Sequence, residues 1–271
     1  MAQKTATKLI FPRVVTAAEA IYDSLQPVQW CPSCAKVLDE SEISQPNHVC
    51  DDIYFRFDMS ESSVDELMLT VPGVVGRRVS LVAWTTTPWS LPANTCVAVG
   101  ADISYQFVLT NADEVLVVAK PLRAEFIRKI GLKGTKVLGE ANGRELENLQ
   151  TKHPLEDRFS PVVLSDHVLP TAGTAVVHIA PGLGGPDFNV GRAYRLDMIA
   201  PFEDDGTLSA EAGEFAGRSL QAADGAVIER LRERDALLLN GKFEREYAHC
   251  AACGHMVLDR VACKAERATE R

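Results

Sequence analysis

The sequence has no long hydrophobic run. Its longest apolar stretches, residues 79–83 and 236–239, fall far short of the ~20 residues that a membrane-spanning helix needs. Before Leu9 there is also no apolar region of the kind that a secretory signal peptide carries. We therefore expect a cytoplasmic protein that has no membrane partner.

An excess of positive charge is absent as well. The 28 Lys and Arg residues against 37 Asp and Glu residues give a formal net charge of −9 at pH 7. This balance counts against a protein that holds a long nucleic-acid duplex by its phosphates, but not against one that captures the end of a strand. The clearest basic stretch overlaps a predicted helix at residues 121–130, so a solvated helix face is favoured over a contact with a nucleic-acid backbone. It consists of Lys120, Arg123, Arg128, Lys129, Lys133 and Lys136.

What is present is an ordinary globular composition, with 46% hydrophobic and 24% charged residues in a chain of 271. This length can bury one large core, or the core of a large domain with a small appendage. The apolar pattern predicts strands at residues 53–58, 79–85, 95–99, 105–109, 114–119 and 175–179, the first of them half-buried. It predicts helices at residues 16–25, 121–130, 187–195 and 220–234, a turn at 142–143, and a loop or short helix at 58–69.

Four of the seven cysteines form two C-x-x-C pairs, Cys31 with Cys34 and Cys250 with Cys253. One pair alone could be redox-active, metal-binding or incidental. Two pairs supply the four thiolates of a tetrahedral structural zinc site, and disulfides are disfavoured in a cytosolic chain. The gap of more than two hundred residues is natural if a whole domain is inserted between the two halves of the site. Further ligand candidates near the second pair are His249, His255 and Cys263.

Residues 84–94, here called the threonine loop, read WTTTPWSLPAN and follow a predicted strand. Pro88 fixes its own φ and holds Thr87 extended, so the threonines lie where the chain leaves the sheet. Three adjacent hydroxyls with freed backbone N–H groups form a polar lip that could hold a sugar hydroxyl or an ester oxygen. The alternative is an edge strand that is merely rich in threonine.

Residues 173–188 carry the second group of candidate residues. The strand at 175–179 places Val176 and His178 on one face, and a loop with three glycines follows, in which backbone can approach a ligand closely. Asp187 begins a predicted helix, where a carboxylate complements the helix dipole. Asp187 and His178 could thus bind a ligand. The alternatives are that Asp187 only stabilises the end of its helix and that His178 is an ordinary core histidine.

Together these motifs resemble the editing (connective-peptide) domain of isoleucyl-tRNA synthetase. The threonine loop is similar to its threonine-rich signature, in which the valyl and leucyl enzymes carry Arg in place of the third Thr. Residues 178–188 match the pattern His-x-Ala-Pro-Gly-x-Gly-x-x-Asp-Tyr/Phe. The family also has a Trp-Cys-Pro-x-Cys segment before the domain and a Cys-x-x-Cys segment after it, and the resemblance covers residues 27–261.

The resemblance implies an α+β fold, with a β-barrel-like editing domain of class I aminoacyl-tRNA synthetases, helices packed around it, and a zinc ribbon formed by the two chain ends. We expect an N-terminal segment at residues 1–50, the editing domain at 51–245, and the second zinc knuckle and tail at 246–271. Structural zinc would be held by Cys31, Cys34, Cys250 and Cys253.

The resemblance also implies an aminoacyl-tRNA deacylase that hydrolyses misacylated tRNA, with isoleucine tRNA mischarged with valine as the expected substrate. Such editing is needed because one methylene discriminates valine from isoleucine too weakly for translation. In the family the aspartate grips the substrate ammonium and the histidine lines the side-chain pocket, which gives Asp187 and His178 here. The implied catalytic residues are Thr86, Thr87 and Asp187, acting on a positioned water with backbone amides. The implied substrate-binding residues are Thr85, Trp89, Asn94, His178, Gly182, Leu183 and Gly184.

Three positions depart from the family pattern: Ser90 replaces Thr, Ala175 replaces Gly, and Leu183 replaces His or Phe. The last two could alter the shape of the pocket. HIGH-like and KMSKS-like motifs are absent, so no amino-acid activation is expected, and Met1 with the tail at 264–271 favours a natural free-standing relative over an excised domain.

The expected partner is the acceptor end of a tRNA that carries a misattached amino acid, and a synthetase is a further candidate. We expect the protein to be a monomer. The alternatives are a non-catalytic module that binds tRNA or a synthetase, and a hydrolase of a small aminoacyl ester or adenylate.

Overall fold

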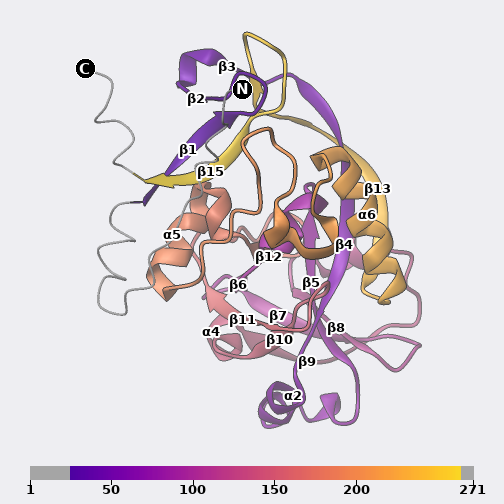
Figure 1. Cartoon of the computed structure of the whole chain (residues 1–271). Helices are drawn as coiled ribbons and strands as arrows, with labels where there is room; N and C mark the ends of the chain where they lie inside the picture. Colours follow the sequence, from indigo (N-terminus) through magenta and orange to yellow (C-terminus); the bar gives the residue numbers. More distant parts are fainter. Residues whose placement is uncertain (1–24, 264–271) are drawn as a thin grey trace.

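The computed structural model describes residues 25–263, in which two larger and two smaller sheets are joined by short helices (Figure 1). The predicted helix at 16–25 lies outside these residues except for Leu25, which belongs to a strand, and the tail at 264–271 lies outside as well. None of the helices in the described range is long and apolar enough to cross a bilayer.

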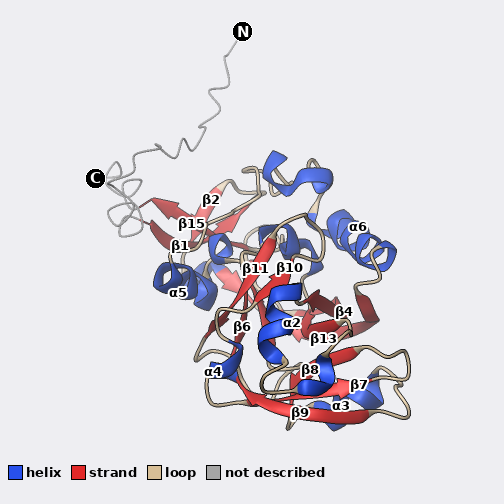
Figure 2. Ribbon diagram, turned by 90° about the horizontal axis from the view of Figure 1, so that it is seen from below, coloured by secondary structure: helices blue, strands red, loops and turns tan. Residues whose placement is uncertain are grey.

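The largest sheet has six strands, and its neighbours are antiparallel except for one parallel pair, β5 with β8. In spatial order they are β13 (Leu237–Glu246), β4 (Asn47–Asp58), β5 (Val79–Thr85), β8 (Val115–Ala119), β7 (Ser104–Leu109) and β9 (Lys136–Asn142). A second sheet of four strands has the order β10 (Gln150–Lys152), β11 (Phe159–Leu164), β6 (Cys96–Val99) and β12 (Val176–Ile179). Figure 2 shows the two groups of strands beside each other.

The two larger sheets share one hydrophobic core but do not close into a barrel within residues 25–263. They are joined by an isolated bridge between Met59 and Thr151 and by the hydrogen bond from Ser60 N to Gln150 O, at 2.8 Å. The barrel-like closure expected from the resemblance is therefore not confirmed. The physical reason is that each sheet keeps its own edge strands, and side-chain packing between the sheets replaces a continuous hydrogen-bond ladder.

Residues 53–57 of strand β4 are buried on both faces, so the prediction of a half-buried strand there is wrong. Ile53, Phe55 and Phe57 are fully buried in the main core. On the opposite face, Tyr54 packs against Phe126, which belongs to the helix α3 (Arg123–Lys129). The alternating sequence predicts one solvent-exposed face, but helix α3, which lies elsewhere in the chain, covers that face.

The other helices begin and end close to their predicted positions. They are α2 (Glu61–Leu67), α4 (Gly143–Leu146), α5 (Gly185–Tyr194) and α6 (Leu220–Glu233). The exception is α4, because Asn142 caps a short helix instead of forming the predicted turn. Short 3₁₀ helices are η1 (Glu40–Glu42), η2 (Pro72–Val74), η3 (Pro88–Ala93), η4 (Pro181–Leu183) and η5 (Ala210–Phe215).

Two small sheets bring the first and last described segments together at the top of Figure 1. One contains β15 (Leu258–Cys263), β1 (Leu25–Cys31) and β2 (Lys36–Leu38), and the other contains β14 (His249–Cys250) and β3 (Ile43–Ser44). Pairing of β1 with β15 sets Trp30 opposite Leu258 and so places both C-x-x-C segments at one end of the molecule. The division into residues 1–50, 51–245 and 246–271 stays a prediction.

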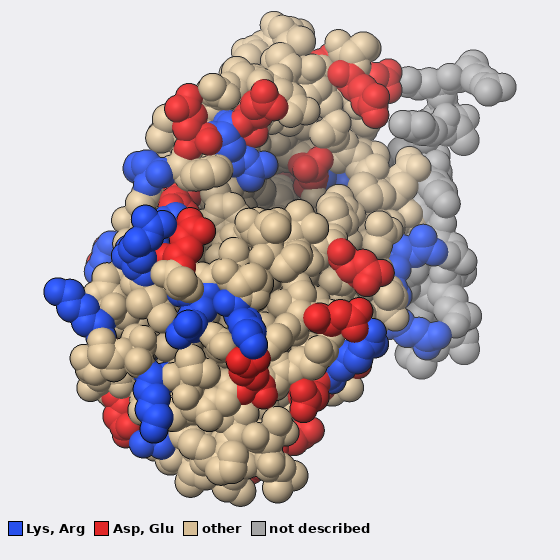
Figure 3. All heavy atoms as spheres, turned by 180° about the vertical axis from the view of Figure 1, so that it is seen from behind, with Lys and Arg blue, Asp and Glu red and all other residues tan. Residues whose placement is uncertain are grey.

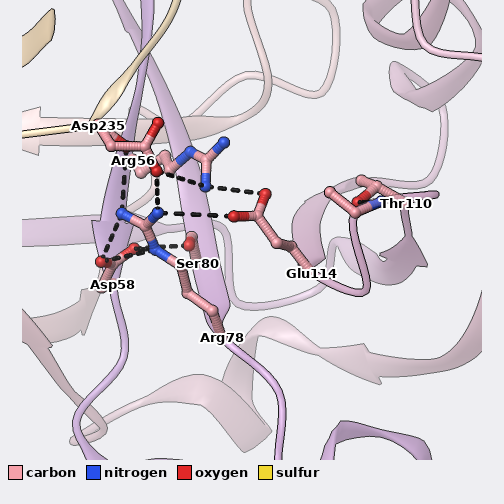
Figure 4. A network of polar contacts seen from close by, with 8 residues as sticks. Arg56, Asp58, Arg78, Ser80, Thr110, Glu114 and Asp235 are labelled. Carbon is pink, nitrogen blue, oxygen red and sulfur yellow. Dashed lines mark hydrogen bonds and ion pairs between the residues drawn. The ribbon is translucent and has the colours of Figure 1, made fainter.

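An ion-pair network fixes the end of β4 against neighbouring segments (Figure 4). Arg78 donates to Asp58 at 2.9 Å and also pairs with Asp235, which follows α6. Arg56 lies 2.9 Å from Glu114, and its side chain is only 10% exposed. A guanidinium this buried needs a charged partner, so the network holds β4 in register with the turn after α6.

Charges of both signs are mixed on the face shown in Figure 3, which has a hollow between them. Within the predicted basic stretch, Lys120 pairs with Glu140 at 3.0 Å and Lys129 pairs with Asp52 at 2.8 Å. These ion pairs favour the interpretation of a solvated helix face over that of a nucleic-acid contact.

Candidate functional site

Four cysteine side chains converge where the first and last described strands meet. The Sγ atoms of Cys31, Cys34, Cys250 and Cys253 all lie within 4.8 Å of one another. The closest approaches, Cys31 to Cys253 at 3.5 Å and Cys34 to Cys250 at 3.9 Å, are far longer than the ~2.05 Å of a disulfide. The donor set and its spacing fit a metal ion, and among the described side chains neither His249 nor His255 belongs to this group. The side chain of Cys263 lies outside the description.

A cavity of about 380 Å³, here called the first cavity, lies beside this cysteine cluster. It is bounded by the threonine loop, by the glycine loop (residues 180–185) with the start of α5, and by residues near the second C-x-x-C pair. Its lining residues are Thr87, Trp89, Ser90, His178, Ala180, Leu183, Gly184, Gly185, Pro186, Asp187, Arg245, Tyr247, Ala248, Val257 and Asp259. Two motifs that lie ninety residues apart in the sequence therefore face one space.

A chain of hydroxyl groups runs from the threonine loop to His178. Thr85 Oγ1 lies 3.2 Å from Thr87 Oγ1, which lies 3.3 Å from Ser90 Oγ. Ser90 donates to the carbonyl of Thr87 at 2.7 Å, so at 3.0 Å it must accept from Nε2 of His178. Burial lowers the pKa of His178 to about 4, and its ring is therefore neutral near pH 7.

Asp187 lies in the first turn of α5 and faces the first cavity. Its Oδ2 accepts a hydrogen bond from the backbone N–H of Ala180 at 2.9 Å, and Oδ1 lies 3.7 Å from Nε2 of His167. Burial raises the pKa of its carboxyl group, while the N–H of Ala180 and His167 oppose that shift. The side chain is 25% exposed, so a ligand in the cavity can reach it.

The glycine loop takes its shape from close backbone approaches. At Gly182 an added Cβ would lie 2.0 Å from the carbonyl oxygen of Ile199, so only glycine fits there. Gly184 has a φ of +78° and lies at the N-terminus of α5. Leu183 between them lines the first cavity, whereas Gly182 does not.

Several predicted residues lie elsewhere. Asn94 is fully buried, where its Nδ2 donates to the carbonyl of Cys96 at 2.7 Å and its Oδ1 accepts from Ser160. Thr85 is also buried, and its Oγ1 accepts from the N–H of Thr87 at 3.1 Å. Thr85, Asn94 and Gly182 therefore shape the first cavity from behind and do not line it. The sequence could not show this, because a loop motif does not reveal which of its side chains turn inward.

Thr86 turns away from the first cavity toward a second one of about 210 Å³, here called the second cavity. Arg245 of β13 donates to its hydroxyl at 2.9 Å. The residues Thr87, Trp89 and Tyr247 line both cavities, so the threonine loop forms the wall between them.

The sequence reasoning missed the residues that β13 and its surroundings bring to the site. Arg245 lies 5.4 Å from the ring centre of Tyr247, and Asp259 of β15 completes the wall on the side of the cysteine cluster. The departure at Ala175 has no place in the lining, because that residue is buried before β12. No local motif marks Arg245, Tyr247 or Asp259, so only the fold reveals them.

Some known proteins are similar to this chain in sequence, and others are similar to it in fold. The chain is 39% identical to the isoleucine–tRNA ligase of Symbiobacterium thermophilum over 241 residues, 89% of this chain and 25% of that protein. It is 40% identical to the isoleucine–tRNA ligase of Methylococcus capsulatus over 232 residues, 83% of this chain and 24% of that protein. The chain thus spans about a quarter of the length of the curated relatives that it matches. No family model matches the chain.

Among solved structures, the crystal structure of GlLeuRS-CP1 matches with a TM-score of 0.57 and 15% identity, over 69% of this chain and 99% of that one. The editing domain of the cytosolic leucyl-tRNA synthetase of P. knowlesi matches with a TM-score of 0.53 and 12% identity, over 73% of this chain and 97% of that one. At such identities the solved structures show the fold alone. The relatives found by sequence are isoleucine–tRNA ligases, and they indicate which synthetase the chain is related to. The chain belongs to the editing (connective-peptide) domain family of isoleucyl-tRNA synthetase.

Proposed function

We propose that this protein is an editing deacylase, which hydrolyses the ester between a misattached amino acid and the terminal ribose of tRNA. The observation that carries the proposal is the first cavity, where the carboxylate of Asp187, the hydroxyl of Thr87 and the side chains of His178 and Leu183 face one space. One anion, one hydroxyl and an apolar wall are suited to an aminoacyl ester, which has an ammonium, a carbonyl and an apolar side chain.

Asp187 would hold the ammonium group of the substrate. Burial disfavours its charged form, and an ammonium ion placed beside it would restore that form and form a charge-assisted hydrogen bond. Oδ2 already accepts from Ala180 N and Oδ1 lies 3.7 Å from Nε2 of His167, so the ammonium would use a remaining lone pair of this carboxylate. This contact would fix the ester carbonyl relative to the threonine loop.

The hydroxyl of Thr87 is the group best placed to orient the ester. The backbone N–H groups that the sequence reasoning expected to be free are engaged, that of Thr87 by Thr85 Oγ1 and that of Trp89 by Asp224. Thr86 would act from the second cavity, where it accepts from Arg245. We propose that the Thr87 hydroxyl positions the carbonyl while water attacks it, and that Thr86 supports Thr87 from the other side of the wall.

Water is proposed as the nucleophile although Ser90 lies beside His178. The proton of Ser90 is committed to the carbonyl of Thr87, and His178 donates to Ser90 rather than accepting from it. With a pKa of about 4, His178 is also a weak base. A serine nucleophile activated by this histidine is therefore disfavoured.

Selection would rest on size, so that valine enters the first cavity while isoleucine does not. Leu183 and His178 supply the walls that a larger side chain would meet. Zinc held by the four cysteines would supply structural support only, by fixing the segment that carries Val257 and Asp259 to the cavity.

The test is deacylation of isoleucine tRNA charged with valine, compared with the same tRNA charged with isoleucine and with valyl adenylate as a small ester-like substrate. Rapid loss of valine from tRNA, with slower loss of isoleucine, supports the proposal. Thr87→Val, which keeps the shape of the side chain and removes the hydroxyl, should lower the rate, and Thr110→Val, which removes a hydroxyl in the β7–β8 turn away from the lining residues, is the matched control. Binding of tRNA without hydrolysis would identify a non-catalytic module, and hydrolysis of the adenylate alone would identify a small-molecule hydrolase.

A further inference from the structure

The carboxyl group of Asp224 contacts the threonine loop from helix α6. Its Oδ1 accepts a hydrogen bond from the backbone N–H of Trp89 at 2.8 Å, across 135 residues of sequence. This N–H belongs to the first turn of η3, where backbone donors have no partner within the helix. The side chain of Thr87, the residue at the N-cap, accepts no backbone N–H of the helix, so Asp224 supplies the missing acceptor from another element.

The position of this contact relates it to both cavities. Asp224 lines the second cavity together with Thr86, Thr87 and Trp89, and the last two of these also line the first cavity. Trp89 is itself nearly buried and packs edge-on against Phe202, with 5.4 Å between the ring centres. The hydrogen bond therefore fixes the backbone of the wall at the residue that follows Pro88.

Within residues 25–263, the carboxyl group of Asp224 forms no salt bridge, although the charge of Lys242 lowers its pKa slightly. Lys242 pairs with Asp51 at 2.8 Å, and burial raises the pKa of Asp224 to about 7. The titratable groups that line the same cavity are His48, Cys50 and Asp51 of β4, Lys242 of β13, and Tyr247. Oδ1 can accept in both the neutral and the ionised form, although the ionised form accepts more strongly, so the hydrogen bond to Trp89 can form without the charge.

We infer that Asp224 is a positioning residue for the proposed deacylation, which holds the Thr87–Trp89 backbone so that the Thr87 hydroxyl faces the substrate. The inference rests on the proposed function. It assigns Asp224 the role of a hydrogen-bond acceptor, and a neutral acceptor of the same shape should therefore replace it.

The experiment compares Asp224→Ala, which removes the acceptor, with Asp224→Asn, which keeps an oxygen in the same place. Glu229→Ala on the same helix is the matched control, because Glu229 is exposed and its carboxylate pairs with Arg232 on the surface. We expect Asp224→Ala to lower kcat for isoleucine tRNA charged with valine about 10- to 100-fold, with little change in KM. Misplacement of a positioning group by about 1 Å costs rates of this order. Asp224→Asn should stay within about threefold of the unmodified protein, since it restores the same bond.

A second measurement does not depend on activity. The backbone amide of Trp89 should exchange its hydrogen faster in Asp224→Ala than in the unmodified protein, while amides of the central strand β8 exchange at unchanged rates. The NMR shift of the same amide should follow a titration near pH 7 that is absent in Asp224→Asn. If Asp224→Ala does not fold, Asp224→Glu replaces it, because a longer side chain moves the acceptor and should likewise speed exchange.

Unchanged exchange at Trp89 in the variant that lacks or moves the acceptor would overturn the inference. Equal loss of activity in Asp224→Ala and Asp224→Asn would also overturn it, because the charge would then be the essential property. An unmodified protein without deacylase activity would instead overturn the proposed function, and the exchange rates would still decide the role of Asp224.

Discussion

The hydroxyl of Ser90 lies 3.0 Å from Nε2 of His178, and the same hydroxyl donates to the carbonyl of Thr87 at 2.7 Å. This arrangement fixes the direction of the proton, so Nε2 of the imidazole carries the hydrogen. Nδ1 is then an acceptor, and it is buried without a hydrogen-bond partner among residues 25–263. His178 is thus held neutral and in one tautomer, which suits a wall of a binding cavity better than a general base.

The first prediction concerns acid stability. An unfolded histidine titrates near pH 6.5, whereas burial lowers the pKa of His178 to about 4 in the folded protein. Between these values the unfolded chain binds more protons, so the contribution is complete above pH 6.5 and is lost as pH falls to 4. Replacing His178 with Gln should remove about 1–3 kcal/mol of the difference in unfolding free energy between pH 7 and pH 4.5. Urea denaturation at both pH values measures this, and identical pH dependence in both proteins would contradict it. His153, whose pKa burial lowers to about 3, should keep part of the slope in the variant.

The second prediction separates two roles of Asp187. As a helix-end residue it would contribute about 0.5–1 kcal/mol, and Asp187→Asn would keep most of that. As the ammonium anchor, its loss should cost roughly 2–4 kcal/mol, or about 30- to 1,000-fold in deacylation rate. The amide oxygen of Asn can still accept from Ala180 N, so the melting temperature should stay near that of the unmodified protein. A normal rate with a lowered melting temperature would leave only the structural role.

Specificity is the subject of the third prediction. Leu183 lines the first cavity, and Leu183→Ala should enlarge it without disturbing Asp187. For isoleucine tRNA, the ratio of the deacylation rate of the isoleucine ester to that of the valine ester should then rise about 10-fold. The reason is that one methylene is worth roughly 1–3 kcal/mol in such a pocket. The ratio of the two deacylation rates is the measurement. An unchanged ratio would show that Leu183 is not the wall that excludes the larger side chain.

A fourth prediction concerns Ala175, which has a φ of +55° and lies directly before β12. A left-handed backbone costs about 1–2 kcal/mol in a residue with a Cβ, and substitution by glycine removes this cost. Part of the stabilisation is offset because glycine has a greater conformational entropy in the unfolded chain. Ala175→Gly should therefore raise the free energy of unfolding by about 0.5–1 kcal/mol. Deacylation should not change, because Ala175 does not line the first cavity. A stabilised protein with altered specificity would show that the departure acts on the pocket after all.

The fifth prediction concerns the metal. Purified protein should contain about one equivalent of zinc, and Cys31→Ser or Cys250→Ser should abolish its binding. A chelator should lower the melting temperature, and activity should fall only as the first cavity loses the wall that carries Val257 and Asp259. Cys96→Ser, in the buried strand β6, is the control that should leave zinc content unchanged. Metal content well below one equivalent in all proteins would exclude the site.

The sequence by itself determined the elements that local chemistry controls. β5 ends at Thr85, just before Pro88, as the pattern predicts, Asp187 lies in the first turn of its helix, and the four cysteines of the two C-x-x-C pairs lie together as a shared metal site requires. These features depend on a restricted φ, on helix-end electrostatics and on ligand chemistry, all of which are encoded in a few neighbouring residues.

Only the tertiary structure decided which of those residues face a common space. Thr87 lines the first cavity while Thr86 turns to the second, and Asn94 is buried behind both, although all three share one motif. Arg245 and Asp224 reach the threonine loop from β13 and α6, through contacts that span 159 and 135 residues of sequence. Such contacts depend on how sheets and helices pack over long separations, and no local periodicity records them.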